Sequence, residues 1–166
     1  QMIPEINELI EWLPKNIPSN QETSIVHGDF RLDNMIFDPI THEVKAILDW
    51  ELSTLGNPIA DFTYHMMSWR LPAGAKGLGM MGSDLKSLNI PSESEYAELY
   101  YKKTGREKID NWDFYMAYNI FRLAGIAQGI VGRVRDGTAS SSEAKNYEAF
   151  VPILGKLGWS IVEGIK

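Results

Sequence analysis

Apolar side chains recur at a spacing of three or four residues along most of this chain, which is typical of helices with one buried face. The first such stripe predicts a helix over residues 4–13, which Pro14 should end. A similar stripe predicts a helix over residues 58–69, with Pro58 in its first turn. A capping box formed by Ser92 and Glu95 predicts another over residues 92–105, which Gly105 should end, and Asp110 should start a long helix over residues 110–137. A last helix should follow a capping box formed by Ser140 and Glu143, and Pro152 should kink or split it.

Between the first two predicted helices the apolar positions form short runs instead. Residues 23–27 predict one strand, and residues 34–38 and 45–49 predict two more. The segment between the second and third runs, residues 38–42, is rich in turn-forming residues. The sequence therefore predicts an α+β fold that is mostly helical and carries a small β-hairpin layer.

The register of this hairpin decides which polar side chains meet. If Asp38 pairs with Lys45, antiparallel pairing places Asn34 opposite Asp49, at about 5 Å. The alternation of side chains along a strand would then put Glu51 on the same side as Asp49. We expect these polar groups to gather at the open end of the hairpin, beside the loop that carries Asp29.

Glycine patterns add two predictions. Gly125, Gly129 and Gly132 leave a smooth face on the predicted helix 110–137, which should permit close helix packing. Residues 77–82 fit the pattern G-x-G-x-x-G, but they follow a helical stripe rather than a strand. We therefore interpret them as part of a flexible loop near a substrate cleft, not as a phosphate site.

Composition narrows the class of protein. A chain of 166 residues is long enough for one domain with a real core, and we predict a single domain over residues 1–166. Its net charge of −6 argues against a nucleic-acid partner, and no apolar run reaches the roughly 20 residues of a membrane span. The absence of cysteine excludes thiol chemistry and fits a reducing compartment, for which we expect the cytoplasm, with an organelle as the alternative.

The residues that best explain a chemical function follow the first predicted strand. Asp29 is the candidate catalytic base, because phosphoryl transfer depends mainly on positioning and a carboxylate suffices. Asn34 and Asp49 supply the hard oxygen ligands that magnesium prefers. Arg31 could neutralise charge on a transferred phosphoryl group, and His27 is better suited to bracing the loop than to moving protons.

These residues could also have a purely structural role. Asp29 could be a solvated turn residue, and Asn34 and Asp49 could be strand-end caps. Glu51 is equally well explained as a metal ligand or as an exposed charge at a strand end. Arg31 could belong to a surface ion pair.

Three segments in order then resemble a known group of enzymes. His27–Asn34 resembles the catalytic loop of the kinase-like superfamily that contains aminoglycoside phosphotransferases and choline kinases. Ile47–Glu51 is similar to the metal-binding segment of that superfamily, and Gly56–Asp61 to the G-x-P-x-x-D run that follows it. The residues of these segments, HGDFRLDN and ILDWELSTLGNP, are most similar to those of the kinase-like domains associated with acyl-CoA dehydrogenases.

The resemblance implies a role for each matching residue. Asp29 would accept the proton of a substrate hydroxyl, while Asn34 and Asp49 would hold Mg²⁺ against ATP. Glu51 matches the choline-kinase-like form of the metal segment, which makes it a third candidate ligand. Asp61 corresponds to a buried aspartate that holds the catalytic loop.

The resemblance also implies that half of an ATP site is missing. The superfamily builds this site between two lobes, and the first lobe carries a phosphate-binding loop and a strand lysine. The 26 residues before His27 predict only a helix and a connector. We therefore expect this chain to be a C-terminal catalytic lobe whose partner is the N-terminal lobe of the same parent protein. The surface left uncovered would also allow a homodimer.

Three classes of function remain to be compared. The first is a small-molecule kinase that transfers the γ-phosphate of ATP to a hydroxyl of a small acceptor, with a hydroxyacyl thioester as one candidate. The second is a metal-dependent phosphohydrolase, which would need further His and Asp ligands downstream. The third is a non-catalytic lobe that acts as a binding or scaffold module.

Overall fold

A computed structural model describes residues 3–19, 22–74, 79–138 and 146–165 of the chain. The elements are mostly helices, with four short strands, so the predicted α+β, mostly helical fold is confirmed. The chain divides into two compact units, one formed by residues 1–21 with 113–166 and the other by residues 22–112. Among the described residues, no helix combines the length and apolar character needed to cross a membrane.

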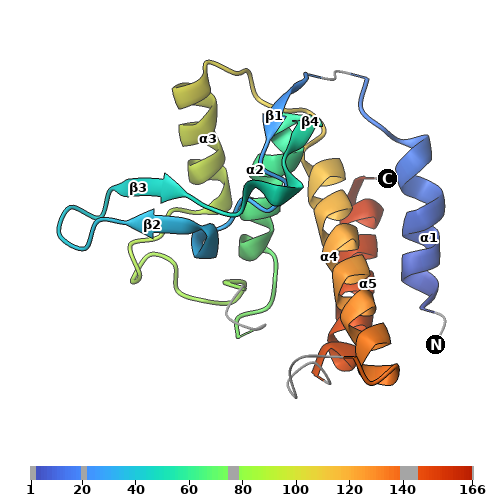
Figure 1. Ribbon diagram of the computed structural model, residues 1–166. Helices are drawn as coiled ribbons and strands as arrows, with labels where there is room; N and C mark the ends of the chain where they lie inside the picture. The colour runs from blue at the N-terminus through green and yellow to red at the C-terminus, as the bar shows by residue number, and fades with distance from the viewer. Residues whose placement is uncertain (1–2, 20–21, 75–78, 139–145, 166) are drawn as a thin grey trace. The chain divides into compact units, whose positions relative to one another are not determined.

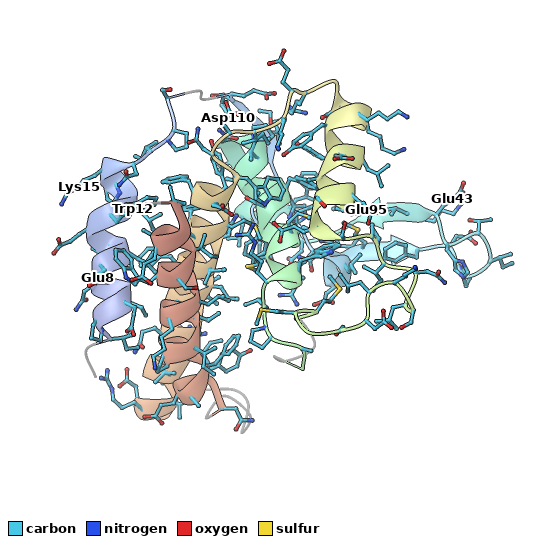
Figure 2. The ribbon with its side chains drawn as sticks, turned by 180° about the vertical axis from the view of Figure 1, so that it is seen from behind. Glu8, Trp12, Lys15, Glu43, Glu95 and Asp110 are labelled. Atoms are coloured by element: carbon cyan, nitrogen blue, oxygen red, sulfur yellow. The ribbon has the colours of Figure 1, made fainter. Side chains whose placement is uncertain are left out.

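The first unit is built from three helices that share one core (Figure 1). They are α1 (Pro4–Trp12), α4 (Trp112–Arg135) and α5 (Tyr147–Ile165). The buried centre contains Leu9 of α1 and Val162 of α5, both fully buried, and Trp12 packs against it. Figure 2 shows Trp12 on the packed side of α1, whereas Lys15 points to solvent.

Close helix packing in this unit depends on glycines other than those predicted. A Cβ atom at Gly125 would meet nothing within 4 Å, and the same holds for Gly132. A Cβ at Gly155 or Gly158 of α5 would instead lie 3.0 or 2.9 Å from side chains of α1. The prediction for the α4 glycines is therefore wrong, because an added Cβ at these positions would come within 4 Å of no other helix among the described residues.

Of the two predicted effects of Pro152 on the last helix, a split is excluded. Helix α5 continues through Pro152 without being split. Pro152 lies in the second turn, where the missing N–H removes only one backbone hydrogen bond near the start of the helix. The predicted capping box of Ser140 and Glu143 lies outside the described residues.

The second unit contains two small antiparallel sheets (Figure 1). Strand β1 (Ser24–Val26) pairs with β4 (Thr54–Gly56), and β2 (Met35–Phe37) pairs with β3 (Val44–Ile47) in the predicted hairpin. Figure 2 shows Glu43 at the tip of this hairpin, pointing outward. Strand β4 was not predicted, because residues 54–56 are too few to show an alternating pattern.

The register of the hairpin differs from the prediction by one residue. Met35 pairs with Ile47, and the Leu48 N–H donates to the Asn34 carbonyl at 2.8 Å, so Asn34 faces Leu48 rather than Asp49. The cause is the turn: the Asp38 N–H donates to the Glu43 carbonyl, and a bulge follows between Ile36 and Phe37. The turn is thus two residues tighter than predicted, and the extra residue of β3 in the bulge, Lys45, restores one of these two, which leaves a net shift of one residue.

Two helices complete the second unit, and the first of them contacts β1. Helix α2 (Pro58–Met66) begins at the predicted proline and is followed by a short 3₁₀ turn, Met67–Trp69. Helix α3 (Glu93–Thr104) has the predicted capping box at Ser92 and ends at Gly105. Rings from α2 and α3 stack against each other, with the centroids of Phe62 and Tyr100 3.7 Å apart.

The glycine-rich segment between these helices is only partly described. Residues 77 and 78 of the G-x-G-x-x-G pattern lie outside the described residues. The rest of the pattern returns alongside the end of α2, since the Met80 N–H donates to the Ser68 carbonyl and the Met81 N–H donates to the Leu71 carbonyl. Gly79 approaches so closely that a Cβ there would lie 1.9 Å from the Pro72 carbonyl oxygen.

Candidate active site

The loop that follows β1 is anchored to α2 by one carboxylate. The backbone N–H groups of His27 and Gly28 donate to the two carboxylate oxygens of Asp61, at 2.6 and 2.9 Å. Asp61 lies in the first turn of α2, where Asn57 caps the helix by accepting from the Ile59 N–H. A negative side chain is favourable at this end of a helix. Asp61 therefore fixes the loop backbone just before Asp29.

His27 occupies the buried side of this loop. The residue is only 2% exposed, and its Nδ1 accepts from the Asp29 N–H at 3.2 Å. The other nitrogen, Nε2, then carries the proton and donates to the Leu48 carbonyl at 2.7 Å. His27 thus joins the loop to the segment that leads into Asp49.

Gly28 is the one position in the loop where a side chain is excluded. Its φ of +84° lies in the left-handed region, and a Cβ there would lie 2.5 Å from the Leu52 carbonyl oxygen. Only glycine allows these two backbone segments to pass so closely. Asp29 follows directly on this constrained turn.

Asn34 and Asp29 form the polar centre of the site. The Asn34 side-chain Nδ2 donates to the Asp29 carbonyl at 2.9 Å and to the Asp29 carboxylate at 3.1 Å. Both side chains are half-buried. Because Nδ2 is used in this way, Asn34 Oδ1 is turned to the other side and accepts no hydrogen bond from the described residues.

Arg31 lies beside this pair. Its guanidinium forms an ion pair with Asp33, and its Nε is buried without a hydrogen-bond partner among the described residues. Burial lowers the pKa of Arg31, but the bond to Asp33 and the nearby charge of Asp29 more than offset this, so its net pKa is raised. Arg31 therefore stays positively charged next to the Asp29 carboxylate.

Asp49 is held in an unusual backbone conformation. Its φ and ψ are 66° and 49°, in the left-handed region that non-glycine residues rarely adopt. Trp50–Leu52 then form a 3₁₀ turn, closed by the Ser53 N–H donating to the Trp50 carbonyl at 2.9 Å. The expectation that Asp49 and Glu51 share one side of a strand is therefore wrong, because no strand continues through them.

The predicted residues are not all brought into contact. No hydrogen bond or ion pair joins the side chains of Asp49 or Glu51 to the Asp29–Asn34 pair among the described residues. Both of these acidic side chains are exposed. No group of three or more His, Cys, Asp or Glu that could hold a metal occurs in the described part of the chain.

Aromatic rings that were not predicted connect the two motif segments. The ring centroid of His27 lies 4.7 Å from that of Trp50 and 6.1 Å from that of Phe30. Phe30 in turn contacts His65 of α2 edge to face, at 6.1 Å. The positions of Phe30 and Trp50 beside the motif residues were the only signal in the sequence, and aromatic residues are most often explained by burial alone.

Comparison with known proteins identifies the family. A sequence model of the phosphotransferase enzyme family matches residues 2–99. Acyl-CoA dehydrogenase family member 10 of Mus musculus is 46% identical over 158 residues, which cover 95% of this chain and 15% of that protein. Acyl-CoA dehydrogenase family member 11 of Homo sapiens is 39% identical over 160 residues, covering 95% of this chain and 20% of the relative.

A solved structure agrees over almost the whole chain. A protein from Ralstonia eutropha, described provisionally as an aminoglycoside phosphotransferase, superposes with a TM-score of 0.93 and 46% identity. The match covers 99% of this chain and 50% of the solved one. The predicted resemblance and kinase-like fold are therefore confirmed, and the chain spans half or less of each of these relatives. With the family model matching more than half of its residues, this chain belongs to the phosphotransferase enzyme family.

Proposed function

We propose that this chain is the catalytic lobe of an ATP- and Mg²⁺-dependent phosphotransferase that acts on a hydroxyl of a small molecule. Asp29 is the base: it accepts the hydroxyl proton while the acceptor oxygen bonds to the γ-phosphorus of ATP and ADP leaves. The observation that carries the proposal is the bond from the Asn34 amide to the Asp29 carboxylate, on a loop fixed by Asp61.

The positions of these groups agree with what phosphoryl transfer needs. Catalysis of this reaction is mainly positioning and charge stabilisation, so a rigidly held carboxylate is more important than a strongly basic one. Asp29 is held by its own backbone N–H, which donates to His27, and by two bonds from Asn34. Arg31 carries a positive charge beside it, available to the transferred phosphoryl group.

The donor set fits magnesium. Mg²⁺ is usually bound by one or two protein oxygens together with substrate phosphates and water, not by a complete protein cage. Asn34 Oδ1 and the exposed Asp49 carboxylate offer such oxygens. The bound ion would neutralise charge on the phosphates of ATP. Glu51, exposed and close in sequence, is a further candidate ligand.

An upstream lobe would complete the site. The solved relative is about twice the length of the matched region, and half of it has no counterpart here. Directly opposed side chains of β1 and β4, Ile25 and Leu55, are 74% and 71% exposed. Such a face suits coverage by another part of the same protein. The relatives named as acyl-CoA dehydrogenase family members suggest a hydroxyacyl thioester as the acceptor.

The test uses the chain together with its upstream coding sequence. Transfer of labelled γ-phosphate from ATP to hydroxyacyl thioesters that differ in the position of the hydroxyl would be measured for the wild type and for Asp29→Asn. Loss of the base should reduce kcat by roughly 10²- to 10⁴-fold. Glu43→Gln, at the exposed tip of the hairpin, is the matched control and should leave kcat unchanged.

Two results would refute specific parts of the proposal. Undiminished transfer by Asp29→Asn would show that this carboxylate is not the base. Release of phosphate from simple phosphoesters in the absence of ATP would instead favour a phosphohydrolase. Asn34→Ala separates the metal role, because it should raise the Mg²⁺ concentration needed for half-maximal rate.

A further inference from the structure

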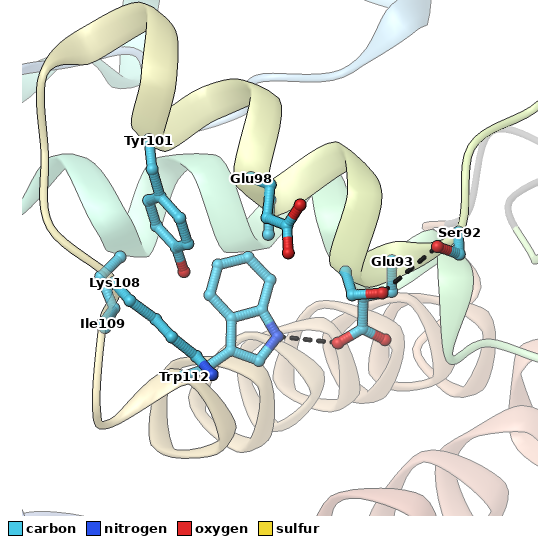
Figure 3. A pocket seen from close by; sticks show the side chains of 9 residues that line it. Ser92, Glu93, Glu98, Tyr101, Lys108, Ile109 and Trp112 are labelled. Carbon is cyan, nitrogen blue, oxygen red and sulfur yellow. Dashed lines mark hydrogen bonds between the residues drawn. The ribbon is translucent and has the colours of Figure 1, made fainter.

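A pocket separate from the residues around Asp29 lies in the second unit, between α3 and the segment that follows it (Figure 3). Its volume is about 510 Å³, within the range of small-molecule sites. Its walls come from both sides of the Gly105 turn, and they include Glu93, Glu98, Tyr101, Lys108, Ile109 and Trp112. Apolar and aromatic surface therefore forms the floor, with a few polar groups around it.

The indole of Trp112 is fixed in this pocket. Its Nε1 donates to the Glu93 carboxylate at 2.7 Å, and Arg70 holds the same carboxylate with bonds of 2.6 to 3.1 Å. The guanidinium of Arg70 thus neutralises the negative charge of Glu93. They also hold the indole in place before any ligand arrives, which reduces the entropy cost of binding to its face.

Two charges of opposite sign remain. Figure 3 shows Glu98 on α3 and Lys108 on the following segment turned toward Trp112. Neither side chain forms an ion pair or hydrogen bond with the described residues. A carboxylate beside an indole face favours an organic ammonium group, through charge and cation–π attraction. The ammonium of Lys108 favours an anion at the other wall.

The start of α3 does not compete for that anion. Helix N-termini attract negative groups, but here the Ser92 hydroxyl accepts from the Glu95 N–H and the Glu95 carboxylate accepts from the Ser92 N–H. The terminus is already satisfied and already carries a negative side chain. Tyr101, whose oxygen accepts from the Ile109 N–H, has its pKa raised by burial and so remains a neutral hydroxyl.

We infer that this pocket binds a small zwitterion with an apolar or aromatic body, of the amino-acid type. The ammonium group of the ligand lies between Glu98 and the face of Trp112, the carboxylate pairs with Lys108, and the body rests on Tyr101 and Ile109. This site is independent of phosphoryl transfer at Asp29, because it shares no residue with it.

Three ligands with the same aromatic body test the charge requirement. Phenylalanine carries both charges, phenethylamine carries only the ammonium, and 3-phenylpropanoate carries only the carboxylate. Binding to the ¹⁵N-labelled chain would be followed by the indole N–H resonance of Trp112, assigned with Trp112→Phe. We expect phenylalanine to bind with a dissociation constant on the order of 1 mM and the other two more weakly.

Two variants assign the charges to their partners. Glu98→Gln should weaken phenylalanine and phenethylamine by about two- to fivefold and leave 3-phenylpropanoate unchanged. Lys108→Gln should weaken phenylalanine and 3-phenylpropanoate to a similar extent. Glu107→Gln and Lys103→Gln change the same charges on exposed side chains outside the pocket and should have no effect.

Three results of these binding measurements would contradict the zwitterion site. If phenethylamine binds as tightly as phenylalanine, the pocket recognises an amine and not a zwitterion, and the proposal is overturned. The same holds if neither Glu98→Gln nor Lys108→Gln changes the affinity, or if no ligand shifts the Trp112 resonance. Both side chains lie on the surface, so we expect each variant to unfold at the same temperature as the wild type. A loss of binding in such a variant is then not caused by a loss of folding.

Discussion

Replacing Asp61 with asparagine should loosen the catalytic loop while leaving the helix that carries this residue intact. The carboxylate of Asp61 accepts one hydrogen bond on each oxygen, from the His27 and Gly28 N–H groups. In the asparagine variant one oxygen becomes an NH₂ group, which cannot accept. One backbone N–H then faces a donor, next to a histidine that is almost fully buried.

The expected size follows from the bond that is lost. A hydrogen bond to a charged acceptor contributes about 1.5–3 kcal/mol to stability, and a buried donor left unpaired costs a similar amount. The remaining bond also weakens, because its acceptor is no longer charged. Asp61→Asn should therefore lower the free energy of unfolding by about 2–3 kcal/mol, which corresponds to a Tm lower by roughly 5–10 °C in a chain of this length.

Urea unfolding gives the stability, and amide hydrogen exchange locates the effect. The His27 and Gly28 amides should exchange much faster in Asp61→Asn, while amides in α1 and α5 should change only with the global stability. Asp110→Asn makes the same chemical change at an exposed carboxylate without a hydrogen-bond partner among the described residues. If Asp61→Asn is as stable as Asp110→Asn and the two amides stay protected, Asp61 does not hold the loop.

Three further predictions concern the rest of the chain. Gly158→Ala should lower the free energy of unfolding by about 1–3 kcal/mol, because its Cβ would lie 2.9 Å from a leucine of α1. Gly125→Ala, where a Cβ meets nothing within 4 Å, should leave the stability unchanged or raise it. Equal urea midpoints for the two variants would contradict this prediction. Burial lowers the pKa of His65, so the unfolded chain binds more protons and stability is lost as the pH falls below about 6.5. His65→Phe should reduce that acid loss in unfolding curves at pH 5.5 and 7.5, and exposed His42→Asn should not. Asn57→Ala removes the cap of α2 and should cost about 1 kcal/mol, measured by thermal unfolding.

The elements that could be predicted are those in which one local signal agrees with tertiary packing. The helix starting at Pro58 has a proline in its first turn and buried residues at helical spacing, and the helix after Ser92 has both halves of a capping box. The glycines of α4 show the limit of such reasoning. A glycine pattern says that a close approach is allowed, but only the three-dimensional packing puts the approach at Gly158 of α5.

The failures near the candidate site have a common cause. The hairpin register was inferred from regular strands, whereas the bulge between Ile36 and Phe37 and the left-handed backbone of Asp49 are both departures from regular geometry. The tight turn between Asp38 and Glu43, only partly offset by the bulge, sets Asn34 opposite Leu48, and the left-handed backbone of Asp49 takes this residue into an exposed turn. A left-handed aspartate costs about 1–3 kcal/mol and persists only where its surroundings hold it. His42 and Asn89 share the left-handed backbone, so the conformation of Asp49 is compatible with the proposed metal role but does not by itself assign that role.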